Sequence, residues 1–248
     1  MFYPPALVLI QARQGSSRLP GKSALPLPLG AVGPSATILG RIVTRAKRAR
    51  LVSEIIVATT TEPLDDELAA LAAQLQVGMF RGSEQDVLSR FTEAFTQAVP
   101  SKLIAAVVRL TADNPAIDPG FLDQAVAHHL ATGADYTLTT GLPLGTNLEV
   151  ISPEALLRAH REARQPDERE HVTPYLRRHP ELFKLETLAL AVPSAVAALR
   201  LTVDYASDYA LLSLLYSELG PNFTLADLPT LLARYPWLAA VNAGNVQR

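Results

Sequence analysis

The stretch Ala6-Leu7-Val8-Leu9-Ile10 and the loop after it, Gln11-Ala12-Arg13-Gln14-Gly15-Ser16-Ser17-Arg18-Leu19-Pro20-Gly21-Lys22, decide how this chain is interpreted. The apolar run predicts a buried strand. The loop combines glycines and serines, which let backbone N–H groups approach an anion, with three cations that can neutralise it. A strand that ends in such a loop is typical of a phosphate-binding site. The alternative is a polar surface loop whose cations are solvated.

The spacing of the glycines separates this loop from a P-loop. A P-loop reads G-x-x-x-x-G-K-[ST], whereas Gly15 and Gly21 have five residues between them. Pro20 also removes an N–H where a phosphate cradle would need one. We therefore predict a phosphate-binding loop of another kind, and a P-loop kinase is disfavoured.

The composition limits the classes of protein that the chain can belong to. Its 248 residues, of which 48% are hydrophobic, suffice for one large α/β domain. The net charge of −2 gives no basic field for nucleic acid. The absence of cysteine excludes disulfides, thiolate nucleophiles and Cys-ligated zinc. With no apolar run near the roughly 18 residues of a membrane span and no signal peptide in Met1 to Pro5, we expect a soluble, cytoplasmic protein.

Strand-like and helix-like segments alternate along the chain. We expect strands at 6–10, 54–60, 77–81, 103–110, 134–140, 148–151, 183–192 and 199–204, and helices at 37–51, 65–76, 84–98, 118–132, 153–164 and 207–219. Buried strands that alternate with helices predict an α/β fold with a mostly parallel central sheet and helices on both faces. We expect a single domain over residues 1–248, with the irregular segment of about 141–190 as an insertion over the sheet.

The helix expected at 37–51 carries several basic residues. Arg41, Arg45 and Arg48 share one face of it. In a nearly neutral chain, such a face is expected to be solvated rather than to bind RNA.

Two aspartates follow buried strands on the sheet edge that carries the phosphate loop. Asp113 comes after the strand at 103–110, and Asp204 after the segment at 199–204. Ligands of open α/β sheets bind beyond the carboxyl ends of the strands. Two carboxylates that face a phosphate loop suit Mg²⁺. An ordinary turn at Asp113 is the alternative, and Asp208 is expected only to stabilise the start of a helix.

Five segments carry a resemblance to a known family. They are QARQGSSRLPGK (11–22), RGSEQDVLSRF (81–91), RLTADNPAIDP (109–119), REHVTPY (169–175) and RLTVDYASDY (200–209). The chain resembles the spore-coat polysaccharide biosynthesis protein F family, which is similar to the 3-deoxy-manno-octulosonate and N-acylneuraminate cytidylyltransferases. This resemblance implies a GT-A-like nucleotide-diphospho-sugar transferase fold and a homodimer with dimer contacts near the 141–190 segment.

The resemblance also implies the site residues. CTP would be held by Gln11, Ala12, Arg13, Gly15, Ser16, Arg18, Lys22, Thr59, Thr60 and Asp113, with Ala58 beside the cytosine. Asp113 and Asp204 would carry Mg²⁺. The acceptor, expected to be an acidic, ulosonic-acid-like sugar of surface polysaccharide biosynthesis, would meet Glu149, Arg169, Glu170 and His171.

The expected reaction transfers CMP from CTP to a sugar hydroxyl and releases pyrophosphate. Arg13 and Lys22 would act as catalytic residues by stabilising charge on the phosphates. The general base stays open between a metal-activated hydroxyl and His171. Two rival functions are a glycosyltransferase on the same fold, although the chain has no Asp-x-Asp, and a nucleotide-binding protein without catalysis.

Overall fold

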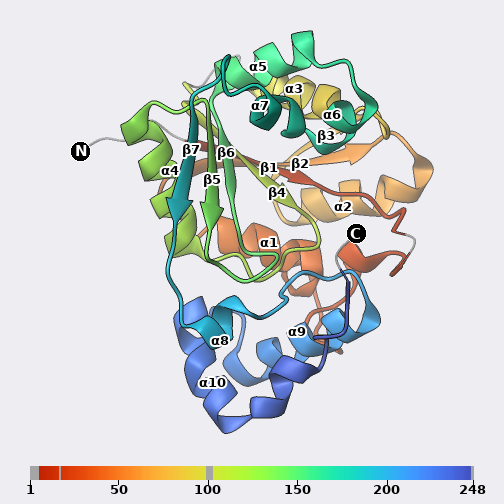
Figure 1. The fold of residues 1–248 in the computed structure, drawn as a ribbon. Coiled ribbons are helices and arrows are strands. Elements are labelled where there is room, and N and C mark those ends of the chain that lie inside the picture. Colours follow the sequence, from red (N-terminus) through yellow and green to blue (C-terminus); the bar gives the residue numbers. More distant parts are fainter. Residues whose placement is uncertain (1–5, 17, 99–102, 247–248) are drawn as a thin grey trace.

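A seven-stranded sheet forms the centre of the computed structural model, which describes residues 6–16, 18–98 and 103–246. Its strand order is β3-β2-β1-β4-β6-β5-β7 (Figure 1). The strands are β1 (Ala6–Gln11), β2 (Val52–Thr60), β3 (Gly78–Gly82), β4 (Ala106–Thr111), β5 (Tyr136–Thr140), β6 (Glu149–Ile151) and β7 (Leu185–Ala189). Residues 1–5, for which the sequence predicts no signal peptide, lie outside the described residues.

The register of the parallel strands brings two loops to one edge of the sheet. Strand β1 pairs in parallel with β2 and β4, and Gln11 lies level with Ala58 on one side and Thr111 on the other. Strand β6 is the antiparallel member, between β4 and β5. The loops that follow β1 and β4 therefore leave the sheet side by side.

Helices cover both faces of the sheet, as the alternation of strands and helices predicts. The described helices are α1 (Ile38–Ala46), α2 (Asp66–Gln74), α3 (Val87–Ala98), α4 (Pro119–Thr132), α5 (Pro153–Glu162), α6 (Pro166–His171), α7 (Pro174–Arg178), α8 (Ser194–Ala197), α9 (Ala206–Leu219) and α10 (Leu228–Arg234). Short 3₁₀ turns lie at η1 (Lys22–Ala24), η2 (Pro34–Ala36), η3 (Pro63–Asp65), η5 (Leu225–Asp227) and η6 (Pro236–Ala240).

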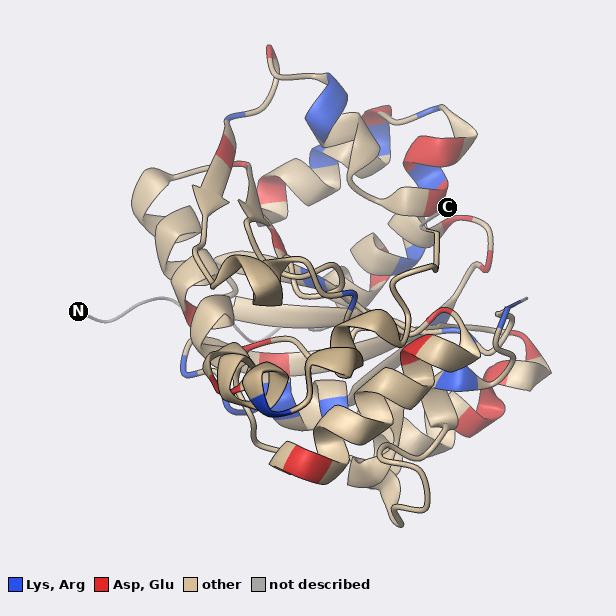
Figure 2. Ribbon diagram, turned by 60° about the horizontal axis from the view of Figure 1, so that its bottom comes forward, with Lys and Arg blue, Asp and Glu red and all other residues tan. Residues whose placement is uncertain are grey.

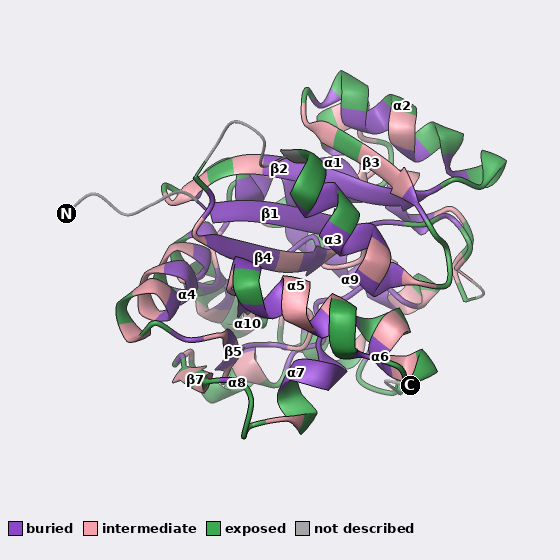
Figure 3. Ribbon diagram, turned by 90° about the horizontal axis from the view of Figure 1, so that it is seen from above, coloured by how far each residue is buried: buried purple, intermediate pink, exposed green. Residues whose placement is uncertain are grey.

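Alternate residues of β1 enter two separate cores. Val8 packs on one face with residues of α1, α4 and α9, while Leu9 packs on the other with α3, α5 and α7. This is the period-2 alternation of a strand that is buried on both sides. Figure 3 shows the buried central strands beneath α3 and α5.

Polar side chains fix where several helices begin. Thr37 accepts from Gly40 N at 3.0 Å, Asp118 from Gly120 N at 2.9 Å, and Ser152 from Ala155 N at 3.2 Å. Each satisfies one N–H that the first turn leaves without a partner. Two of these helices, α4 and α5, have a proline in the first turn, where its missing N–H costs no intrahelical bond.

The strand expected at 199–204 is not formed. These residues are buried, but their ladder is a single bridge between Leu144 and Arg200. Gly145 lets the 141–147 loop approach so closely, since a Cβ there would lie 2.6 Å from Thr202 N. The segment still ends at the same sheet edge, because Val203 N donates to Asp113 O at 2.8 Å.

The basic face expected to be solvated is so only in part: Arg48 is exposed, but Arg41 is half-buried and Arg45 is buried. Arg45 is 1% exposed, donates to Ile117 O at 2.6 Å and lies 4.5 Å from the ring centre of Phe223. Arg41 lies over the ring of Tyr216. These arginines join α1 to the α9 region, and Figure 2 shows Lys and Arg interspersed with Asp and Glu over the ribbon.

The segment 141–190, expected as an insertion over the sheet, contributes both to the sheet and to its cover. Strands β6 and β7 belong to the sheet, while α5, α6 and α7 lie over the face that α3 also covers (Figure 1). Among the residues that the structure describes, no helix has the length and apolarity that a membrane crossing requires.

Candidate active site

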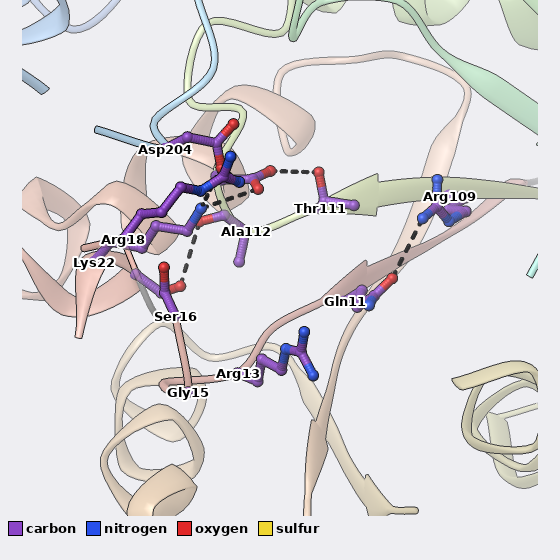
Figure 4. A pocket seen from close by; sticks show the side chains of 12 residues that line it. Gln11, Arg13, Gly15, Ser16, Arg18, Lys22, Arg109, Thr111, Ala112 and Asp204 are labelled. Carbon is purple, nitrogen blue, oxygen red and sulfur yellow. Dashed lines mark hydrogen bonds and ion pairs between the residues drawn. The ribbon is translucent and has the colours of Figure 1, made fainter. Parts of the chain in front are cut away.

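A cavity of about 250 Å³ lies beyond the carboxyl ends of β1 and β4 (Figure 4). In the close view, Arg18, Lys22 and Asp204 gather at one end, Gln11 and Arg109 lie at the other, and Arg13 lies between them. The predicted residues that line it are Gln11, Arg13, Gly15, Ser16, Arg18, Lys22, Asp113 and Asp204. Ser17 of the same loop lies outside the described residues.

The phosphate loop is anchored by a residue that we did not predict, Asp65. This buried carboxylate accepts from Gln14 N at 2.7 Å and, through its other oxygen, from the backbone and hydroxyl of Thr60. The loop folds back on itself where Gly21, at φ 70°, donates to Gln14 O. A non-glycine residue would be strained at that φ.

Lys22 connects the loop to both predicted metal ligands. Its Nζ lies 3.2 Å from Asp113 Oδ2 and 3.1 Å from Asp204 Oδ1, and it donates to the carbonyl of Val203 at 2.6 Å. Arg18 Nη2 also reaches Asp204 Oδ1, at 2.8 Å. The two aspartates therefore face one point, as their positions after the buried segments predict.

A buried network fixes Asp204 from behind. Arg200 bonds to Asp204 Oδ2 at 2.7 Å and to Asp208 Oδ1 at 3.0 Å. Asp208 also accepts from the backbone N–H of Asp204 at 2.9 Å and from Asn242 and Asn245. Burial alone would raise the pKa of Asp208, but Arg200 and the backbone donors hold it below its usual value. Asp208 thus has the structural role that we expected.

Glu149 binds protein partners and does not line the cavity. Arg109 reaches Glu149 Oε2 at 2.5 Å, and Glu149 Oε1 accepts from the hydroxyls of Tyr136 and Thr173. Burial would raise the pKa of Glu149, but the charge of Arg109 and these hydrogen bonds lower it overall. Arg109 itself lines the cavity. Its place inside an otherwise apolar strand is the sequence signal that could have identified it, because a charge there needs a partner.

Arg90 is a second cation that we did not predict, and its side chain is buried. Arg90 of α3 is fully buried and donates to Ser83 O at 2.5 Å. Burial and the neighbouring charge of Arg13 lower the pKa of Arg90 to about 10. At neutral pH, Arg90 therefore adds positive charge beside Arg13.

Ala12, Thr59 and Thr60 are buried and are not among the lining residues of the cavity. Ala12 N donates to Ala58 O at 3.2 Å, which continues the β1–β2 pairing by one residue. Thr60 supports the phosphate loop through Asp65. The structure thus places these residues behind the loop.

A second cavity, of about 500 Å³, shares Arg13 with the first. Arg169 and Glu170 of α6 line it together with Glu84, Gln85, Asp86 and Pro166. Arg169 is held by the carboxylate of Asp86 and the carbonyl of His160. His171 is exposed and is not among the lining residues.

The first cavity offers what a polyphosphate and a hard cation require. Four cationic side chains, three of them from the glycine-containing loop, line it together with two carboxylates from other segments. Among the described residues, no three or more His, Asp or Glu side chains are grouped so that they could hold a metal ion. Mg²⁺ is often bound by one or two carboxylates together with substrate phosphates, so these oxygen donors fit it.

Comparisons with known proteins agree with this geometry. A cytidylyltransferase family profile matches residues 7–212. The chain is 35% identical over 237 residues to the spore coat polysaccharide biosynthesis protein SpsF of Bacillus subtilis, covering 93% of this chain and 95% of that protein.

Solved structures share the fold. A cytidylyltransferase from Leptospira borgpetersenii superposes with a TM-score of 0.85 at 30% identity, over 99% of this chain and 100% of the other. A CMP:2-keto-3-deoxy-manno-octonic acid synthetase complexed with CTP gives a TM-score of 0.62 at 16% identity, over 86% of this chain and 99% of the other. On the profile match and the relatives of similar length, this chain is a nucleotidyltransferase that belongs to the cytidylyltransferase family.

Proposed function

We propose that this protein transfers CMP from CTP to a hydroxyl of an acidic, ulosonic-acid-like sugar in surface polysaccharide biosynthesis. The observation that carries the proposal is the meeting of Arg18, Lys22, Asp113 and Asp204 at the carboxyl edge of the sheet. The relative of similar length acts in spore coat polysaccharide biosynthesis. A protein with this fold has been solved with CTP.

In the proposed reaction, the acceptor oxygen attacks the α-phosphorus, and the bond to the oxygen bridging the α- and β-phosphates breaks. The acceptor hydroxyl loses its proton, and pyrophosphate leaves with the electron pair of the broken bond. Arg13, Arg18 and Lys22 would bind the phosphates and stabilise the negative charge that develops on them. Gln11 and Arg109, at the other end of the cavity, would face the nucleoside.

Asp113 and Asp204 would hold the divalent cation, for which we propose Mg²⁺. When bound, such a cation screens the charge of the phosphates and polarises the phosphorus centre. The second cavity, next to Arg13, would receive the acceptor, with Arg169 and Glu170 on its wall. Glu149 would act on the first cavity, by positioning Arg109.

A pyrophosphate-release screen tests this proposal. The protein is incubated with Mg²⁺, each of the four nucleoside triphosphates and a panel of acidic and neutral sugars. We expect release only with CTP and only when an acidic sugar is present. Release with another nucleotide, or equal release with neutral sugars, would contradict the substrate assignment.

The rival functions give different results in the same assay. A glycosyltransferase would consume a UDP- or GDP-sugar and release no pyrophosphate from CTP. A binding protein without catalysis would be stabilised by CTP, by about 2–3 kcal/mol at 100 times Kd, and would turn nothing over. The homodimer stays a prediction from the resemblance, and the cytoplasmic location a prediction from the sequence. Light scattering of the purified protein measures the oligomeric state.

A further inference from the structure

The ammonium group of Lys22 has a full set of acceptors inside the cavity. Its three N–H donors meet Asp113 Oδ2 at 3.2 Å, Asp204 Oδ1 at 3.1 Å and the carbonyl of Val203 at 2.6 Å. The side chain is only 11% exposed. An ammonium has three donors and no acceptor, so Lys22 is bound here as a cation in a site made of oxygens.

That site is the one in which the two aspartates would hold a divalent cation. Mg²⁺ binds oxygens at about 2.0–2.1 Å and needs near-ideal octahedral geometry. A divalent cation held by both carboxylates would compete with the Lys22 ammonium for the two oxygens that this ammonium now contacts. The two positive charges would also repel one another at close range. Lys22 and a metal bridging Asp113 and Asp204 therefore exclude each other.

The other contacts of the aspartates show which oxygens would become available. Asp113 Oδ1 accepts from the hydroxyl of Thr111 at 2.6 Å, and Asp204 Oδ2 is held by Arg200, whose side chain is 8% exposed. Arg200 is buried, whereas Thr111 is half-buried at the cavity wall, and each holds the carboxylate oxygen that does not contact Lys22. The oxygens that face Lys22 are the remaining ones, and they face a common point.

The cations on those two oxygens come from the phosphate loop. Arg18, whose side chain is 33% exposed, is the second partner of Asp204 Oδ1. Arg18 and Lys22 are long, flexible side chains at the cavity wall. Both can turn from carboxylate oxygens to phosphate oxygens without any change in the backbone.

We propose that Lys22 is an exchangeable counter-ion that occupies the metal position until a nucleoside triphosphate enters. Without nucleotide, Lys22 neutralises Asp113 and Asp204 and keeps divalent cations out. The phosphates attract Lys22 away, and one oxygen of each aspartate becomes free for the metal. Nucleotide and metal thereby favour one another's binding, as thermodynamic linkage requires. This inference rests on the proposed function only in taking a triphosphate as the occupant of the cavity.

Titration of the nucleotide-free protein with Mn²⁺ tests the inference without any turnover. Free Mn²⁺ is counted by its paramagnetic resonance signal in the wild type and in Lys22→Met. We expect the variant to bind Mn²⁺ at least about tenfold more tightly, because removing Lys22 frees Asp113 Oδ2 and leaves the partly exposed Arg18 as the one remaining ion-pair partner of Asp204 Oδ1 among the described residues. The double variant Lys22→Met with Asp113→Asn should lose that gain.

Arg13→Met is the matched control. It removes one positive charge from the same cavity, but Arg13 makes no ion pair with either aspartate in the described part of the chain. We expect less than about a threefold change in Mn²⁺ affinity. Equal gains in Lys22→Met and Arg13→Met would overturn the inference, because the effect would then be one of overall charge.

A second measurement covers the case in which Lys22→Met folds poorly. Loss of the counter-ion leaves two carboxylates facing one another, so Lys22→Gln should melt at a lower temperature than the wild type and regain stability when Mn²⁺ is added. The wild type should gain little under the same conditions. Equal stabilisation of both proteins by Mn²⁺ would overturn the inference, whereas a failed CTP screen would overturn only the proposed function.

Discussion

The cavity beyond β1 and β4 and the short helix α6 both carry charged side chains, but they use them differently. In the cavity, Lys22 and Asp204 lie 182 residues apart in sequence and 3.1 Å apart in space. On α6, Arg169 is bound to Asp86, while Glu170 and His171 are exposed. The first region is organised before any ligand binds. On α6, Arg169 is held by Asp86, whereas the other two charged or polar side chains are exposed to solvent.

The largest effect is therefore expected in the cavity. Asp113→Asn and Lys22→Ala should each lower the rate of pyrophosphate release at least about 100-fold, because each removes a charge that acts mainly in the transition state. The rate with CTP and acceptor measures this loss. Circular dichroism and thermal melting check the fold.

Asp66→Asn is the control for the loss of a carboxylate. Asp66 pairs with Arg81 at the start of α2, and its side chain is 66% exposed. We expect near wild-type turnover in this variant. Near wild-type turnover in Asp113→Asn would show that the cavity is not the site of the chemistry.

A smaller effect should follow from Glu149→Gln, which tests whether Glu149 acts through Arg109. Removing the charge loosens Arg109 and should raise KM for CTP about tenfold, roughly the value of one charge-assisted hydrogen bond. The pKa of Glu149 is lowered from its ordinary value of 4.5. Its contribution is therefore present above that value and is lost only as the pH falls through the lowered pKa.

The pH dependence separates positioning from general-base catalysis. Since Glu149 stays ionised, the loss in Glu149→Gln should be the same between about pH 5.5 and pH 8. A loss that shrinks as the pH falls would identify Glu149 as a titrating base instead. Glu162→Gln is the control, because Glu162 likewise accepts from a tyrosine and an arginine, Tyr175 and Arg158, but lies outside both cavities.

The sequence could predict the cavity because its residues directly follow buried segments. Lys22 and Asp113 come after apolar runs that form parallel strands, and such strands end at one edge. Asp204 lies at the cavity as expected, although the strand expected before it is not formed. Leu199, Leu201 and Val203 alternate as in a strand, but they are buried without a full ladder on either side.

Other features could not be predicted because they depend on contacts between residues that are far apart in the sequence. Asp65 has the ordinary position of an acid at a helix start, yet its partner Gln14 is 51 residues distant. The face of α1 was misread because Tyr216 and Phe223, which cover Arg41 and Arg45, belong to the α9 region. Helices α6 and α7 are short, start at prolines and carry many charges. They therefore lack the apolar periodicity from which a helix can be predicted.

The smallest change in kinetics is expected for variants of α6. These variants test whether α6 really differs from the cavity. Glu170→Ala and His171→Ala should each raise KM for the acceptor sugar by about threefold, the scale of a single exposed polar contact. KM for CTP and the melting temperature should not change, because both side chains are exposed. Glu154→Ala, an exposed acid on the neighbouring α5, is the control and should change neither KM.

A rise in the acceptor KM of more than about 30-fold in either α6 variant would mean that the side chains of α6 are as well ordered as those of the cavity once the acceptor is bound. The two regions would then differ only in when their charges are brought together. Arg169→Ala distinguishes support from binding, since Arg169 also joins α6 to Asp86 and His160. If Arg169 only supports α6, Arg169→Ala should lower the melting temperature, and its effect on the acceptor KM should be no larger than that of Glu170→Ala. A larger rise in the acceptor KM at an unchanged melting temperature would place its guanidinium on the sugar.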